Sequence, residues 1–160
     1  MDETSTSTRP AEASGLHIHP PLLALLCFAG ALALHLMLPT ERTVYLHHVL
    51  GLLLVAGGVG LSFYAAAIFQ ARDTTKDPYG EPAKFVTASP YTFTRNPMYV
   101  GLTAVLLGFA VFFASPVMIL APIIFAVLID RMVIPREEQT MERTFGAEYT
   151  EYQGRVRRWL

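Results

Sequence analysis

The stretch that decides the fold is residues 96–129, NPMYVGLTAVLLGFAVFFASPVMILAPIIFAVLI, which contains no Asp, Glu, Lys or Arg. As one straight helix, residues 96–129 would be about 51 Å long. The hydrocarbon core of a bilayer is only about 30 Å thick. Ser115 and Pro116 lie near the middle of the stretch, so we predict a helical hairpin with one arm at about residues 97–114 and the other at about 116–134.

Two further apolar runs precede this hairpin, at about residues 21–38 and 47–69, and each is long enough to cross a bilayer. Hydrophobic residues make up 52% of the 160-residue chain and charged residues only 16%. A soluble bundle would therefore lack the polar surface to enclose these runs. We predict an all-α, polytopic membrane protein with about four transmembrane helices in one domain, residues 16–160. The polar residues 1–15 are predicted to form a disordered tail.

Lysine and arginine residues gather in two segments outside the predicted spans. The segment 72–95 has four of them and the segment from Arg131 to the end has six, against one in residues 39–46. Because the cytoplasmic loops of membrane proteins are rich in Lys and Arg, four spans place both basic segments on the cytoplasmic side. The sequence thus predicts an integral protein of a bacterial inner membrane, with both termini and any active site facing the cytoplasm.

Small residues mark the second predicted span, which contains Gly51, Gly57, Gly58 and Gly60. Glycines in a transmembrane helix usually let a neighbouring helix approach closely, and nothing around them has the strand–turn–helix context of a nucleotide loop. The single cysteine, Cys27, lies in an apolar run and is predicted to be a small core thiol. It excludes a disulfide within the chain and a cysteine-based zinc site.

Apolar side chains recur in the C-terminal segment 136–160 at spacings of three and four residues: Met141, Phe145, Tyr149, Tyr152, Val156 and Trp159. This spacing predicts one face of an amphipathic helix. Such a helix is expected to lie on the membrane surface or to pack against the segment 72–95.

Two polar clusters flank the hairpin. Arg95 and Asn96 precede the first arm, and Pro97 suits the first turn of its helix. The free N–H groups and the dipole of that turn favour a carboxylate or a phosphate. The second cluster follows the other arm and comprises Asp130, Arg131, Glu137 and Glu138. The two adjacent glutamates point about 100° apart on a helix, so they cannot serve one ligand equally. Together the clusters predict a polar, cytoplasm-facing pocket between helices.

Residues 91–101, YTFTRNPMYVG, resemble the signature of the isoprenylcysteine carboxyl methyltransferases and their bacterial relatives, which reads Arg-His/Asn-Pro-x-Tyr-x-Gly at this point. A second signature of that family is an acidic pair followed by Phe-Gly-x-x-Tyr-x-x-Tyr and a basic end. It resembles Glu137-Glu138, residues 145–152 and residues 155–159 here. The two blocks agree in order and spacing, and the resemblance covers about residues 70–160.

This resemblance implies a methyltransferase that uses S-adenosylmethionine. Carried over by position, the cofactor site would be lined by Lys84, Phe85, Val86, Tyr91, Asn96, Pro97, Met98, Tyr99, Glu137 and Glu138. Glu137 would hold a cationic or hydroxyl-bearing part of the cofactor, and either Arg95 or the beginning of the following helix would hold its carboxylate. Tyr91 and Tyr99 would offer their faces to the adenine or the sulfonium. The predicted catalytic residues are Arg95 and Arg131.

The resemblance also implies a lipophilic or lipidated acceptor, such as the carboxylate of a prenylated cysteine, that arrives through the bilayer. Family members active on prenylcysteine carry an arginine a few residues before the acidic pair. Val133 stands at about that place here, and Arg131 and Arg136 are the nearest arginines. The resemblance therefore supports methyl transfer better than prenylcysteine specificity, and phospholipid N-methylation is a further variant of the same activity. Membrane lipids are expected contacts, and we expect neither a nucleic-acid partner nor a metal site.

Two other functions agree with the same sequence. Some sterol reductases share a similar C-terminal region and use NADPH, although they have more spans. A non-catalytic membrane protein that kept the scaffold is the second alternative. Methyl transfer from a reactive sulfonium needs little beyond in-line positioning, so the lack of an evident catalytic triad does not exclude the methyltransferase.

Overall fold

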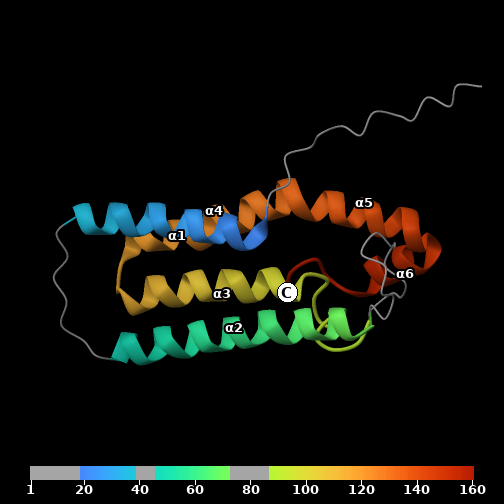
Figure 1. The fold of residues 1–160 in the computed structure, drawn as a ribbon, viewed down its shortest axis with the longest axis horizontal. Coiled ribbons are helices and arrows are strands. Elements are labelled where there is room, and N and C mark those ends of the chain that lie inside the picture. The colour runs from blue at the N-terminus through green and yellow to red at the C-terminus, as the bar shows by residue number, and fades with distance from the viewer. Residues whose placement is uncertain (1–18, 39–45, 73–86) are drawn as a thin grey trace, which may run out of the picture.

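The computed structural model describes residues 19–38, 46–72 and 87–160, which are helical apart from short turns and a C-terminal extended segment (Figure 1). The predicted N-terminal tail lies outside these residues. The helices are α1 (Pro20–Met37), α2 (Leu46–Arg72), α3 (Pro97–Phe112), α4 (Leu120–Leu128), α5 (Ile134–Phe145) and α6 (Ala147–Arg155). A 3₁₀ turn, η1 (Pro116–Ile119), precedes α4, and a π-helical turn, η2 (Ile129–Val133), joins α4 to α5. The prediction of an all-α, polytopic membrane protein is confirmed.

Three helical stretches of the described residues are long and apolar enough to cross a membrane, namely Pro20–Met37, Leu46–Ile68 and Pro116–Phe145. The other predicted span, Pro97–Phe112, is apolar but has only 16 residues, or about 24 Å of helix. The predicted hairpin is present, because α3 ends before Ser115 and the next helical turn begins at Pro116. Its second arm runs on through η2 and α5, so the helix extends well beyond the predicted end at residue 134.

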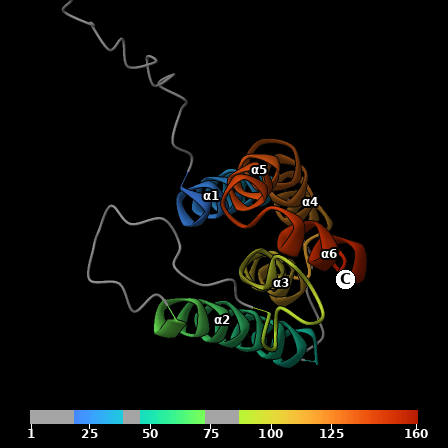
Figure 2. The ribbon, with the colours of Figure 1, turned by 90° about the vertical axis from the view of Figure 1, so that its right-hand side faces the viewer.

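The helix α3 lies at the centre of the bundle, with α2 on one side of it and α1, α4 and α5 on the other (Figure 2). Large side chains fill the space between α3, α4 and α1: Leu106, Met118, Phe125 and Ile129 are almost fully buried. Phe28 of α1 meets Phe109 of α3, with the ring centroids 4.7 Å apart. Many Leu, Ile and Val side chains on the outer faces of α1, α2 and α4 are exposed, as expected for helices that face lipid.

Glycines allow α2 and α3 to approach closely. A Cβ atom added to Gly58 would lie 2.5 Å from the carbonyl oxygen of Gly101, and one added to Gly51 would lie 2.7 Å from that of Gly108. Each helix thus presents two glycines seven residues apart to the other. The prediction that glycines serve helix packing is confirmed at Gly51 and Gly58, whereas an added Cβ at Gly57 would meet nothing within 4 Å.

Gly58→Ala should lower the free energy of unfolding by about 1–3 kcal/mol, because the new methyl group would force the two backbones apart. Gly57→Ala is the matched control, since it adds the same group to the adjacent residue with open space around it. The control should be neutral or slightly stabilising, because alanine favours helix over glycine. Thermal unfolding of both variants in detergent tests this, and equal stability would contradict the close approach.

The C-terminal amphipathic helix is interrupted at Gly146. The backbone of Gly146 has φ 53° and ψ −122°, a conformation that glycine adopts most readily. The prediction of one continuous helix over residues 136–160 is therefore wrong: α5 and α6 meet at an angle there, and the chain is extended after Arg155. Part of the predicted apolar face is retained, because Tyr149 and Tyr152 are buried.

Candidate active site

The turn that leads into α3 is fastened between α2 and α6. The buried hydroxyl of Tyr91 donates a hydrogen bond to the carbonyl of Ala65 at 3.4 Å, and the hydroxyl of Tyr152 donates to the carbonyl of Tyr91 at 2.6 Å. Burial, with a smaller contribution from the Glu137 carboxylate, raises the pKa of Tyr91 to about 12. Burial likewise raises the pKa of Tyr152, so both hydroxyls remain donors at neutral pH. The C-terminal segment thus packs against this turn, one of its two predicted locations.

The beginnings of α3 and α5 meet through one short hydrogen bond. Pro97 begins α3, which places Tyr99 in its first turn. The Tyr99 side chain is buried, and its hydroxyl donates to the Glu137 carboxylate at 2.6 Å. Glu137 is exposed as a residue, although burial of its carboxyl group against Tyr99 raises its pKa. The two predicted polar clusters therefore share one rim, where a carboxylate on the outer side of a buried tyrosine is open to a ligand.

Next to this pair lies a group of two arginines and two carboxylates, which we call the charge quartet: Arg95, Arg158, Asp130 and Glu138. Arg95 donates to Glu138 at 2.8 Å, and both side chains are nearly buried, at 12% and 11% exposed. Arg158 binds Glu138 through two nitrogens, at 3.2 and 2.6 Å. Its third nitrogen meets Asp130 at 3.3 Å. The two positive and two negative charges of the quartet balance each other.

Residues 156–159 form an extended segment, the C-terminal strap, that crosses the beginning of α3. The amide N–H of Arg95 donates to the carbonyl of Arg157 at 2.9 Å. The side chains of Thr94 and Asn96 both donate to the carbonyl of Arg158, at 3.1 and 3.0 Å. Trp159 completes the attachment, because its indole N–H donates to Asp130 at 2.9 Å.

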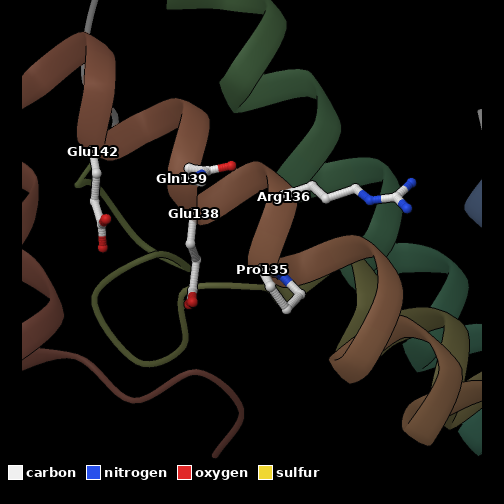
Figure 3. Close-up of a pocket in the computed structure, with 5 residues that line it drawn as sticks. All are labelled: Pro135, Arg136, Glu138, Gln139 and Glu142. Carbon is white, nitrogen blue, oxygen red and sulfur yellow. The ribbon is translucent and has the colours of Figure 1, made fainter. Parts of the chain in front are cut away.

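A shallow cavity of about 360 Å³ lies along α5, lined by Pro135, Arg136, Glu138, Gln139 and Glu142. Figure 3 shows Glu138 and Glu142 on the same side of α5, with Arg136 directed away from them. The cavity borders the charge quartet through Glu138, whereas Tyr99 and Glu137 do not line it. It therefore adds an acidic recess beside the rim.

Most of the predicted site residues in the described part of the chain come together here, but with different partners. Arg95 and Glu138 bind each other, and Asn96 binds the strap. The carbonyl of Met98 accepts a hydrogen bond from Ser62 at 3.1 Å. The Arg131 side chain is 82% exposed, with Asp130 at 3.9 Å. The predicted cofactor residues Lys84, Phe85 and Val86 lie outside the described residues. Sequence reasoning missed Arg158 and Trp159, although both belong to the basic end of the second signature.

The pattern of residues that defines the phospholipid methyltransferase family matches residues 46–148, which include α2, the hairpin, the Tyr99–Glu137 pair and Glu138. The chain belongs to the phospholipid methyltransferase family. A stretch of 63 residues, 39% of this family member, is 40% identical to the full length of an uncharacterized protein of Haemophilus influenzae. No solved structure gives a significant match.

Membership makes the protein a membrane methyltransferase and implies a methyl donor. It favours methyl transfer over the reductase and the non-catalytic alternatives. The match does not confirm the narrower resemblance to the isoprenylcysteine carboxyl methyltransferases. The C-terminal strap of this phospholipid methyltransferase relative lies beyond the matched residues.

Proposed function

We propose that the protein transfers a methyl group from S-adenosylmethionine to the amine of a phospholipid head group at the rim formed by α3 and α5. The observation that carries this proposal is the exposed residue Glu137, whose carboxylate accepts a hydrogen bond from the buried Tyr99 hydroxyl at 2.6 Å. Arg95 and Arg158 bind the carboxylates of Glu138 and Asp130 rather than that of Glu137. The Glu137 carboxylate therefore remains for a ligand, and a carboxylate so placed attracts a cation.

The residues around the rim fit both ends of the cofactor. S-adenosylmethionine has a carboxylate, an ammonium and a sulfonium. The Nε–H of Arg95 is buried and finds no hydrogen-bond partner among the described residues, which is the kind of donor that a ligand carboxylate satisfies. Glu142, which lines the cavity of α5, supplies negative charge for the ammonium.

When bound, the cofactor would supply an electrophilic methyl group. A nitrogen–carbon bond forms as the sulfur–carbon bond breaks, and the amine loses one proton. Glu137 is the residue that attracts the head-group ammonium and accepts that proton. Tyr99 holds the carboxylate in place through its hydroxyl. The chain otherwise contributes position, because methyl transfer requires the donor, the methyl group and the amine in line.

The charge of the rim favours an amine over a carboxylate as acceptor. Arg95 and Arg158 are each bound to carboxylates, and Arg131 lies 3.9 Å from the carboxylate of Asp130. The acceptor carboxylate of a prenylated cysteine would meet the negative charge of Glu137 instead. The signature at residues 91–101 supports the prenylcysteine alternative, which is therefore included as an outcome of the test.

The test uses the purified protein in vesicles with S-adenosylmethionine labelled in its methyl group. Vesicles containing phosphatidylethanolamine should yield labelled lipid, and vesicles of phosphatidylcholine, whose nitrogen is already fully methylated, should yield none. Labelling of added N-acetyl-farnesylcysteine alone would make the acceptor assignment wrong and leave the methyltransferase intact. The absence of both labelled products and of S-adenosylmethionine binding by calorimetry would overturn the proposed function.

A further inference from the structure

The C-terminal strap connects the two halves of the rim and follows the last residue of the family match, residue 148. On one side, the carbonyl of Arg158 accepts hydrogen bonds from Thr94 and Asn96 at the beginning of α3. On the other side, the guanidinium of the same arginine binds Glu138 on α5. Arg158 therefore sets the distance between Asn96 and the carboxylate of Glu138, which is adjacent to Glu137 in the sequence.

The strap is attached too firmly to act as an opening lid. Its backbone accepts hydrogen bonds from residues 94–96 and from the Arg95 side chain at 3.3 Å. Its side chains add charge-assisted bonds to Glu138 and Asp130, and such bonds are about twice as strong as neutral ones. Segments that open readily have few contacts of this kind. The strap is therefore a fixed wall of the site.

The π-helical turn η2 explains how one strap reaches both Asp130 and Glu138. Residues eight positions apart on a regular α-helix point about 80° away from each other. A π turn takes up about one extra residue, which reduces this angle to about 20°. Asp130 lies within η2, so its carboxylate and that of Glu138 face the same side. Both can then bind Arg158, at 3.3 and 2.6 Å.

We propose that Asp130 and Arg158 are positioning residues, which hold the C-terminal strap as the wall that keeps Asn96 and Glu138 in place beside Glu137. Asp130 anchors the strap through Arg158 and Trp159, and Arg158 transmits this anchorage to both sides of the rim. This inference rests on the proposed function, since the site that it positions is the S-adenosylmethionine site.

The experiment compares Asp130→Ala with the wild type, both as the full chain in detergent. Trp159 is the only tryptophan of the sequence, so its fluorescence reports the strap directly. In Asp130→Ala we expect the emission of Trp159 to shift to longer wavelength, because the indole loses its hydrogen-bond partner and becomes more exposed to water. We also expect the Kd for S-adenosylmethionine by calorimetry to rise about tenfold, or about 1.4 kcal/mol. Asp130→Asn keeps an acceptor for the indole and should recover part of both effects.

Arg155→Gln is the matched control, because Arg155 precedes the strap and forms an exposed pair with Glu151 at 3.7 Å. It should leave the emission and the Kd unchanged. If Asp130 had a merely structural role, Asp130→Ala would lower the number of binding sites per chain and leave the Kd unchanged. That result would overturn the proposal, and so would any Kd within twofold of the wild-type value. If the wild type itself binds no S-adenosylmethionine, the proposed function fails. In that case, a shift of Trp159 emission to longer wavelength in Asp130→Ala would still support the attachment of the strap by Asp130. The absence of that shift would contradict it.

Discussion

Glu138→Ala should lower the free energy of unfolding by about 3–5 kcal/mol, which is the usual cost of removing one partner from a buried ion pair. Glu138 binds both Arg95 and Arg158 and is only 11% exposed. Its removal leaves two guanidinium groups facing each other without the carboxylate that separates them. The cost arises from this uncompensated charge more than from the lost hydrogen bonds. Urea or thermal unfolding in detergent, followed by helical circular dichroism, measures the change.

Glu142→Ala supplies the control for this prediction. Glu142 is on the same helix, one turn further along and on the same side, but it is exposed (Figure 3). Its removal should change stability by less than about 0.5 kcal/mol, as is usual for surface substitutions. If Glu138→Ala and Glu142→Ala unfold alike, then Glu138 does not hold the strap to α5, and the charge quartet contributes nothing to the fold.

The fold could be predicted largely from the positions of the charges. A charged side chain or an unsatisfied backbone group is costly in hydrocarbon, so uncharged runs of sufficient length locate the helices before any tertiary contact is known. The uncharged run 96–129 was too long for one span, so Ser115 and Pro116 near its middle indicated the turn of the hairpin. The meeting of Tyr99 with Glu137 then follows from topology, because the two ends of a hairpin lie on the same side of the membrane.

The partners of the polar site residues could not be predicted in the same way. Arg95 and Asn96 looked available to a ligand, yet Arg95 binds Glu138, and both residues bind the strap, which lies 61 and 62 positions away in the sequence. An arginine has several possible acceptors, and the choice depends on the path of the chain after α6. That path depends on Gly146, which breaks a helix whose apolar spacing continues across it. Pattern alone does not distinguish a glycine inside a helix from one that ends it.

Glu137→Gln should reduce the rate of methyl transfer by about 10²–10⁴-fold, the usual contribution of a group that accepts a proton in the reaction. Glutamine keeps an oxygen that can accept the hydrogen bond from Tyr99, so the fold should be unchanged. It removes the negative charge that attracts the ammonium of the acceptor and the basic oxygen that takes its proton. Initial rates with labelled S-adenosylmethionine and phosphatidylethanolamine vesicles measure the loss, with Glu148→Gln, an exposed carboxylate of α6, as the control.

Tyr99→Phe tests the contribution of the position of the Glu137 carboxylate separately from that of its charge. Phenylalanine keeps the buried ring of Tyr99 and removes only the hydroxyl that fixes the carboxylate at 2.6 Å. Since the charge remains, the rate should fall by about tenfold, close to the effect of one lost hydrogen bond to a charged group. The order of the two effects is the decisive result. If Tyr99→Phe is as slow as Glu137→Gln, the tyrosine hydroxyl itself takes part in the chemistry. If Glu137→Gln keeps the wild-type rate, Glu137 neither binds the amine nor accepts its proton, and the rim of α3 and α5 is not where the methyl group is transferred.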